Sequence, residues 1–323
     1  MRLRKSLAAT LFGLSFAAAP AVHGQSGHCL DRTFIANVFD HGAVPTGLTK
    51  DNFQIAYHGQ SLTPLHISYS EGPRRVMVLL DVSGSMSTLG NTAKWKIARL
   101  AAWDLVAALL PGSKVGLITF STTSETQAPL STNHAPITDW INRGENRRLD
   151  MLKGRTALYD AIQSALTQLR PTEPGDAIYV ITDGGENASK TGRSKVQTAL
   201  RESGVRLFTL ILPPGSTYTA VELTGSENLS SLSNDSGGFV ETLGIEPTVR
   251  VVDERLKQQL RVHSLQLSLQ IAAFYSLSVE LPDNPQKPKH WEITIADSGK
   301  RKKSVWVGYP HEVPSCQMHL AQR

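Results

Sequence analysis

The hydrophobic residues follow two different patterns along the chain. Between residues 75 and 244, short apolar runs alternate with segments in which apolar residues recur every three or four positions. The runs predict buried strands, and the segments between them predict amphipathic helices. This alternation predicts an α/β fold with a doubly wound, mostly parallel sheet. Strands are expected at 76–80, 115–120, 177–182, 205–212 and 239–242, and helices at 92–110, 135–143, 156–169, 193–202 and 222–232.

The two ends of the chain show the period-two alternation of half-buried strands instead. Phe53, Ile55 and Tyr57 alternate near the start, and Trp291 and Ile293 alternate near the end. Such short pieces are too small to form separate stable sheets. We therefore expect one small antiparallel β-sandwich built from both chain ends. Its strands are expected at 33–39, 52–57, 274–281 and 291–295, with a hairpin turn at 297–299 and a returning strand at 304–307.

The segment that leads from the central sheet to the C-terminal strands fits both patterns. Leu256, Leu260, His263 and Leu267 form a helical stripe, whereas the last apolar residues of the segment alternate as in a strand. We expect a helix as far as about Leu269. His263 on this stripe is interpreted as a core or boundary residue and not as a ligand.

The N-terminus has the features of a secretory signal peptide. Arg2, Arg4 and Lys5 form a basic start, the apolar run 7–19 is short for a membrane span, and residues 22–24 offer a cleavage site. The alternative is an uncleaved anchor. No later stretch is long and apolar enough for a membrane helix. We expect a secreted, periplasmic or cell-envelope protein.

These patterns divide the chain into four parts. The expected parts are a signal peptide at 1–24, the first part of the sandwich at 25–74, the α/β domain at 75–244, and a connecting helix with the rest of the sandwich at 245–323. The mature chain of 299 residues is long enough for one large or two modest cores.

Composition and charge narrow the functional classes. The chain is 40% hydrophobic and 19% charged, which is typical of a globular protein. Removing residues 1–24 deletes three basic groups and lowers the net charge from +5 to about +2, too little to indicate a nucleic-acid partner. The basic run 300–303 reads as a solvated loop; the alternative is a patch for an anionic envelope polymer.

The chain has two cysteines, Cys29 and Cys316. In an oxidising compartment they form either one disulfide or two unpaired thiols. We favour the disulfide, because the expected sandwich places both chain ends in one domain. No cysteine and histidine spacing typical of a zinc site is present in the sequence.

Five oxygen-bearing side chains are expected to meet at the carboxyl edge of the sheet. Asp81, Ser83 and Ser85 follow the first strand, Thr156 stands where a helix is expected to begin, and Asp183 follows the strand 177–182. Ligands bind at this edge in open α/β sheets. Carboxylates and hydroxyls are hard ligands suited to Mg²⁺. Taken singly, each residue also fits a turn or a helix N-cap.

The order of these residues resembles the von Willebrand factor A family and its metal-ion-dependent adhesion site, which reads Asp-x-Ser-x-Ser, then Thr, then Asp. The resemblance implies that the hydroxyls touch a divalent cation directly and that the two carboxylates act mostly through water. Mg²⁺ is the expected ion, with Mn²⁺ or Ca²⁺ as alternatives. One coordination position is left for a partner's carboxylate. Arg155 departs from the family, which often has Gly before the Thr.

The flanks resemble the secreted acidobacterial-type VWFA-related family. Residues 47–53 are similar to the segment before its A domain, and Gly308-Tyr309 is similar to its closing segment. This resemblance implies an architecture for nearly the whole mature chain.

The expected function is a binding module and not an enzyme. The partner would be a protein that presents Asp or Glu to the metal. The first alternative is a scaffold in an envelope or secretion assembly, with metal for stability. A metal-dependent hydrolase is the second: an aspartyl nucleophile would need a second acid where Ser83 stands, and neither Ser83 nor Ser85 lies in a Gly-x-Ser-x-Gly elbow.

Overall fold

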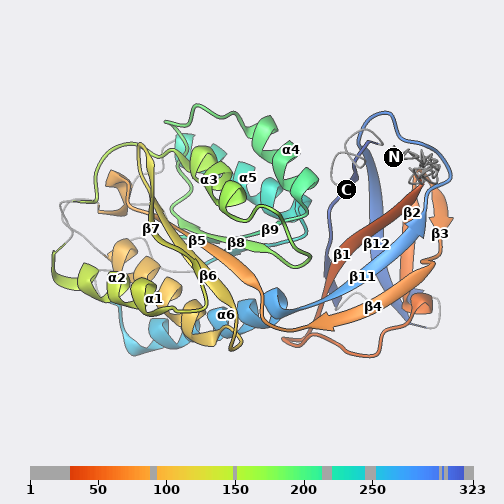
Figure 1. The fold of residues 1–323 in the computed structure, drawn as a ribbon, viewed down its shortest axis with the longest axis horizontal. Helices are drawn as coiled ribbons and strands as arrows, with labels where there is room; N and C mark the ends of the chain where they lie inside the picture. The colour runs from red at the N-terminus through yellow and green to blue at the C-terminus, as the bar shows by residue number, and fades with distance from the viewer. Residues whose placement is uncertain are drawn as a thin grey trace, which may run out of the picture.

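The computed structural model describes residues 30–87, 93–147, 151–212, 220–243, 252–297, 300–301 and 305–315. The expected signal peptide, Cys29, Cys316 and most of the turn at 297–299 lie outside these residues. The described chain forms an α/β part and an all-β part, with helix α6 running from one to the other (Figure 1).

A six-stranded sheet forms the centre of the α/β part, in the order β10-β9-β8-β5-β6-β7. Its neighbours pair in parallel except β6 and β7, which are antiparallel. The strands are β5 (Arg75–Asp81), β6 (Lys114–Phe120), β7 (Ser124–Ser131), β8 (Ala177–Thr182), β9 (Arg206–Ile211) and β10 (Val240–Thr242).

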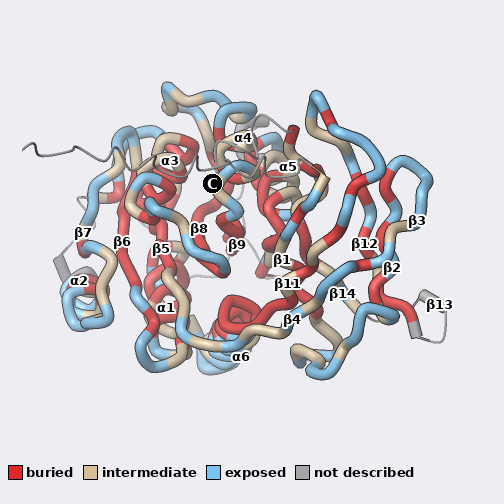
Figure 2. Tube along the Cα trace, turned by 45° about the vertical axis from the view of Figure 1, so that its right-hand side comes forward, coloured by how far each residue is buried: buried red, intermediate tan, exposed pale blue. Residues whose placement is uncertain are grey.

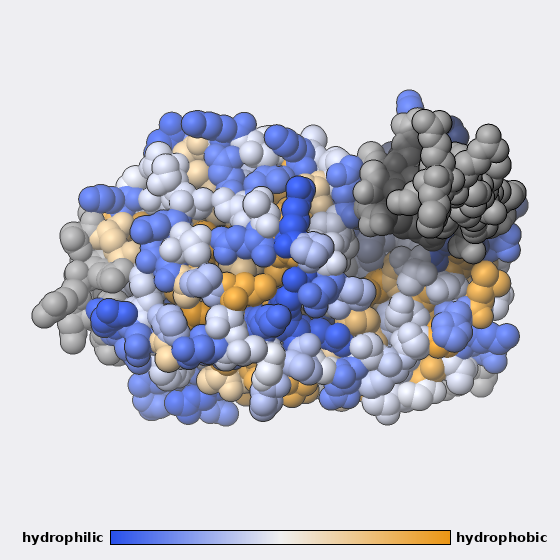
Figure 3. All heavy atoms as spheres, in the orientation of Figure 1, coloured by the Kyte–Doolittle hydropathy of each residue, from blue (hydrophilic) through white to orange (hydrophobic). Residues whose placement is uncertain are grey.

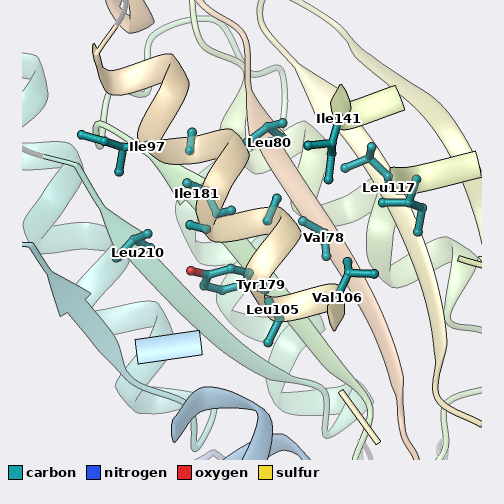
Figure 4. Close-up of a cluster of buried hydrophobic side chains, with 14 of the residues drawn as sticks. Val78, Leu80, Ile97, Leu105, Val106, Leu117, Ile141, Tyr179, Ile181 and Leu210 are labelled. Atoms are coloured by element: carbon teal, nitrogen blue, oxygen red, sulfur yellow. The ribbon is translucent and has the colours of Figure 1, made fainter. Parts of the chain in front are cut away.

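Helices cover both faces of this sheet, because successive residues of each buried strand point to opposite sides. Val78 and Leu80 of β5 face one core, whereas Met77 and Leu79 face the other. Figure 4 shows the first core, where Val78 and Leu80 meet Leu105 and neighbouring side chains of α1. The first core is covered by α1 (Ala93–Ala108), α2 (Ala135–Arg147) and α6 (Glu254–Ala272), and the second by α3 (Leu158–Gln168), α4 (Arg193–Ser203) and α5 (Ala220–Asp235).

Two antiparallel sheets form the all-β part. Their order is β14-β1-β11-β4 in one and β13-β12-β2-β3 in the other, with β15 also paired to β12. Inward residues of both sheets, such as Val38, Tyr57 and Ile293, share one core. The strands are β1 (Asp31–Asp40), β2 (Phe53–Tyr57), β3 (Gln60–Leu62), β4 (His66–Glu71), β11 (Ala273–Glu280), β12 (Lys289–Asp297), β13 (Lys300–Arg301), β14 (Val305–Gly308) and β15 (Glu312–Val313).

This architecture confirms the predicted fold class: a doubly wound sheet with a sandwich made from both chain ends. The ambiguous connecting segment is a helix, α6, which extends to Ala272. The helical stripe decides the outcome because Leu256, Leu260 and Leu267 are all buried on one side of it.

One strand pairing differs from the prediction. The strand at 304–307 was expected to return beside the preceding strand as a hairpin, but β14 pairs with β1 in the opposite sheet, with Val307 opposite Val38. β12 is paired with β2 along one edge, and the short strands β13 and β15 occupy both ends of its other edge. The alternation of residues predicts a strand but does not identify its partner.

Burial is concentrated in the strands of the central sheet (Figure 2). The face seen in Figure 3 mixes hydrophilic residues with small hydrophobic areas. Within the described residues, none of the helices combines the length and the apolar character that crossing a membrane requires.

Candidate metal centre

Two neighbouring strands bring the two predicted acids to one edge. Asp81 is the last residue of β5, and Asp183 directly follows β8. The strands are parallel, with Leu80 opposite Ile181, so both chains leave the sheet at its carboxyl edge. The Thr182 hydroxyl donates to Asp81 Oδ2 at 2.5 Å. This hydrogen bond ties the two strand ends together.

The loop after β5 places two serine hydroxyls beside Asp183. The Ser83 N–H donates to Asp81 Oδ1 at 2.8 Å, which turns the chain back over the strand end. One 3₁₀ turn, Gly84–Met86, follows, and the Ser83 and Ser85 hydroxyl oxygens lie 3.0 Å apart. The Ser85 hydroxyl also donates to Asp183 Oδ1 at 3.1 Å. Four of the five predicted residues are thus joined by hydrogen bonds.

The fifth residue, Thr156, lies just before α3 and is not its N-cap, which is Ala157. The Thr156 N–H donates to Asn187 Oδ1 at 2.9 Å, and its carbonyl accepts from the Asn187 N–H at 3.0 Å. A Cβ built on Gly185 would lie 3.5 Å from Thr156 Oγ1 and 3.9 Å from Asp183 Oδ1. Thr156 and Asp183 therefore face the same small space around Gly185.

Backbone hydrogen bonds join the loop before α3 to the loop after β5. The Gly84 N–H donates to the Gly154 carbonyl at 3.1 Å, and the Lys153 N–H donates to the Val82 carbonyl at 3.2 Å. Gly154 has φ +85°, a left-handed conformation that glycine adopts without strain. The serines and Thr156 are therefore held in a fixed relation by the backbone.

The loop after β8 is held from two sides. The Glu186 carboxylate accepts hydrogen bonds from the Tyr159 N–H at 3.0 Å and from the Ser189 hydroxyl at 2.7 Å. On the other side, α5 approaches so closely that a Cβ on Gly225 would lie 1.7 Å from the Gly184 carbonyl oxygen. The position of Asp183 thus depends on α3 and α5 as well as on its own strand.

The site is buried and carries negative charge. Asp81 is 0% exposed and Asp183 is 1% exposed. Burial, and then the negative charge of Asp183, raises the pKa of Asp81 to about 7, against the lowering effect of its hydrogen bonds. The ammonium of Lys94 lies 2.8 Å from Asp183 Oδ2. One cation, paired with Asp183, is too little to balance two acids and leaves the site short of positive charge.

These residues fit a small divalent cation. The donors are all oxygen, two carboxylates and three hydroxyls, which suits Mg²⁺ better than a soft metal. A cation here would relieve the mutual repulsion that contributes to the raised pKa of Asp81. The described part of the chain has no group of three or more His, Cys, Asp or Glu side chains placed to hold a metal, and this site combines two acids with hydroxyls instead.

The sequence pattern missed three residues that support the site. Thr182 and Asn187 flank Asp183 and hydrogen-bond Asp81 and Thr156, but polar residues after a strand are common and carry no specific signal. Lys94 comes from α1, and nothing in its sequence context indicates that its side chain reaches Asp183. Arg155, which departs from the family pattern, is exposed at the rim.

A comparison with protein families matches the part of the chain that carries the site. The family model of the von Willebrand factor type A domain matches residues 76–186, which contain all five predicted ligands and cover about a third of the chain. The flanks lie outside this match, so their family resemblance stays a prediction. A search of curated proteins found no match.

Several solved structures are similar in part. BatB from Bacteroides thetaiotaomicron is 21% identical, with 62% of this chain and 98% of that chain covered and a TM-score of 0.45. A von Willebrand factor type A protein from Catenulispora acidiphila is 14% identical, with 90% and 74% covered and a TM-score of 0.45. An aerotolerance-related membrane protein from Bacteroides fragilis is 22% identical, with 61% and 99% covered and a TM-score of 0.43. Similarity at this level says nothing about function. The family match and the observed sheet identify this chain as a protein with a von Willebrand factor type A domain.

Proposed function

We propose that this protein is a secreted or envelope-located binding module that holds a protein partner through a divalent cation. The observation that carries the proposal is the cluster of two buried acids and three hydroxyls at the carboxyl edge of the sheet. Asp81 and Asp183 supply the negative charge, and Ser83, Ser85 and Thr156 supply neutral oxygens. The cation, for which the oxygen ligands favour Mg²⁺, supplies a positive charge to which an Asp or Glu of the partner can bind.

The exposure of the five residues suits this role. Asp81, Ser83, Thr156 and Asp183 are buried, whereas Ser85 is partly exposed. The acids thus form the floor of the site, and the accessible side lies at Ser85 and the neighbouring loops. A partner group would approach from that side, where exposed Lys153 and Arg155 also carry positive charge.

A hydrolase has less support. Ser83 stands where an aspartyl nucleophile would need a second acid, and neither Ser83 nor Ser85 lies in a Gly-x-Ser-x-Gly elbow. The scaffold alternative requires that metal stabilises the fold without creating any partner binding, and melting with and without metal distinguishes it.

The proposal predicts metal binding that depends on Asp81. Mg²⁺, Mn²⁺ and Ca²⁺ would be titrated into the mature chain by calorimetry. We expect saturable binding by the wild type and at least about a hundredfold loss in Asp81→Ala and Asp81→Asn, because a carboxylate that neutralises the ion is removed. Asp81→Asn keeps the shape of the side chain and separates the loss of charge from the loss of packing.

Asp139→Ala is the matched control, since Asp139 is exposed on α2, away from the site, and its loss should leave binding unchanged. A wild-type chain that binds none of the three ions contradicts the proposal. With binding established, a metal-dependent pull-down would identify the partner.

A further inference from the structure

Lys94 places a positive charge in the candidate metal centre, although it does not belong to the five-residue motif. It lies in the first turn of α1, and its ammonium donates to Asp183 Oδ2 at 2.8 Å and to the Ser85 carbonyl at 3.3 Å. The side chain is only 13% exposed, and that of Asp183 is 0% exposed. The ion pair is therefore largely shielded from water, and its electrostatic interaction is stronger than that of an exposed pair.

The contact divides the two oxygens of Asp183 between different partners. Oδ2 accepts from Lys94, and Oδ1 accepts from the Ser85 hydroxyl. The Oδ1 atom thus lies on the side of the hydroxyl ligands, and the ammonium lies on the opposite oxygen. Because of this division, a cation beside the hydroxyls would share Asp183 with Lys94 and would not have to replace it.

Lys94 changes the net charge that the site would have with a divalent cation bound. Asp81 and Asp183 contribute two negative charges, which a divalent cation alone would cancel. With Lys94 in place, the same site would carry one uncancelled positive charge. A neutral site has little preference for an anion, whereas a positive site attracts one.

We propose that Lys94 sets the charge of the metal centre. Its positive charge weakens the binding of the cation and strengthens the binding of a carboxylate to that cation. The inference rests on the proposed function and adds that Lys94, a residue outside the five-residue motif, controls how strongly the partner's carboxylate is bound. Exposed Lys153 and Arg155 act in the same direction, because their loop is hydrogen-bonded to the loop that carries the serines. Lys94 is a positioning residue in this scheme, since it acts through Asp183.

The first test compares cation affinities. Lys94→Met and Lys94→Gln remove the charge, and Lys96→Met is the matched control, because Lys96 is exposed two residues further along the same helix. We expect both Lys94 variants to bind Mn²⁺ at least about tenfold more tightly than the wild type, since Asp183 loses its competing cation. Lys96→Met should bind Mn²⁺ as the wild type does. Lys94→Arg, which keeps the charge, should also stay close to the wild type.

The second test measures carboxylate capture on Mn²⁺-loaded protein, with acetate as the probe and its neutral analogue acetamide as the control. Displacement of metal-bound water by acetate is followed by water-proton relaxation. We expect acetate affinity to fall at least about tenfold in Lys94→Met and Lys94→Gln, and acetamide to bind weakly to all variants.

The outcomes separate this inference from the proposed function. A wild type that binds no cation overturns both. A wild type that binds Mn²⁺, with Lys94 variants of equal or weaker Mn²⁺ affinity, overturns the charge-setting role alone and leaves Lys94 as a structural link between α1 and the loop after β8. Unchanged acetate affinity in the Lys94 variants overturns the carboxylate preference. Melting curves without metal show whether the two Lys94 variants are folded. If Lys94→Met does not fold, Lys94→Gln still allows the test, because its amide keeps a hydrogen-bond donor at this position.

Discussion

At the scale of single residues, His263 is an ionisable group kept neutral inside the fold. It lies on α6, is 7% exposed, and its Nε2 is 3.3 Å from the Tyr179 hydroxyl. The Phe239 ring lies beside it, with centroids 6.4 Å apart. Burial lowers the pKa of His263 from its ordinary 6.5 to about 4. This agrees with its interpretation as a core or boundary residue.

His263 predicts a loss of stability in mild acid. Between pH 6.5 and 4 the unfolded chain binds a proton at this side chain that the folded chain does not, so the free energy of unfolding falls as the pH falls through this window. From pH 7.5 to pH 5 the loss amounts to about 2 kcal/mol. Denaturant unfolding of the wild type and His263→Gln at both pH values measures it, and the variant should lack this part of the pH dependence.

The control is His66→Gln, because His66 is exposed on β4 and is solvated in both states. If His263→Gln loses as much stability in acid as the wild type does, then His263 is not the group that takes up the proton.

The five candidate ligands could be found from the sequence because each follows a local rule. Asp81 and Asp183 end apolar runs, and the parallel sheet places such ends together. Lys94 could not be found in this way, since its contact with Asp183 depends on where α1 lies across the sheet. A lysine in a helix is usually solvated, and only the packed structure shows this one reaching a buried acid.

At the scale of elements, helix α5 supports the metal loop through a close backbone contact. Gly225 lies where the helix meets the Gly184 carbonyl, and any side chain there would overlap this oxygen. The helix was expected from its apolar spacing at 222–232 and spans Ala220–Asp235. The spacing gave no reason for a glycine in its interior, which costs about 1 kcal/mol relative to alanine in an isolated helix. The contact with Gly184 supplies that reason.

Gly225→Ala should therefore disturb the site although it touches none of the five candidate ligands. The new Cβ would lie 1.7 Å from the Gly184 oxygen and must displace either the helix or the loop that carries Asp183. We expect a loss of about 1–3 kcal/mol in stability and at least about tenfold in cation affinity. Denaturant unfolding and calorimetric titration measure the two effects.

Gly72→Ala provides the comparison, because a Cβ there has no heavy atom within 4 Å. Cation affinity equal to that of the wild type in Gly225→Ala would show that α5 does not position the metal loop.

The strands of the sandwich illustrate the limits of sequence patterns at this scale. β2 and β12 were predicted because their buried residues alternate, whereas the edge strand β7 and the short strands β3 and β15 were not. Edge strands bury few side chains, so their sequences lack the alternating buried residues by which β2 and β12 were predicted. The transfer of β14 to the other sheet has the same origin, since strand partners are chosen by the whole fold.

At the scale of the whole molecule, one buried arginine joins the central sheet to the sandwich. Arg206 of β9 is 1% exposed and donates to Asn37 Oδ1 at 2.8 Å and to the Gln270 and Ile271 carbonyls, each at 2.9 Å. It also donates to the Gly175 carbonyl at 2.8 Å. Arg206 thus binds β1 of the sandwich and the carbonyl end of α6, where a helix has unpaired acceptors and favours a positive charge.

A second, weaker connection lies nearer the surface. Arg201 of α4 forms an ion pair with Glu312 of β15 at 2.5 Å, with exposed side-chain fractions of 12% and 37%. Partly exposed pairs of this kind contribute about 0–1 kcal/mol. The two arginines therefore offer a direct comparison between a buried and a partly exposed link across the same junction.

Arg206→Met should destabilise the junction far more than Arg201→Met. The first change leaves several buried acceptors without a donor and should cost about 3 kcal/mol or more, whereas the second should cost about 1 kcal/mol or less. Calorimetry would follow each variant. Because Arg206 hydrogen-bonds β1 and the end of α6 from β9, we expect its loss to split unfolding into two transitions, one for the sandwich and one for the α/β part. A single transition with a shift no larger than that of Arg201→Met would mean that the connecting helix and the wider interface hold the two parts together without Arg206.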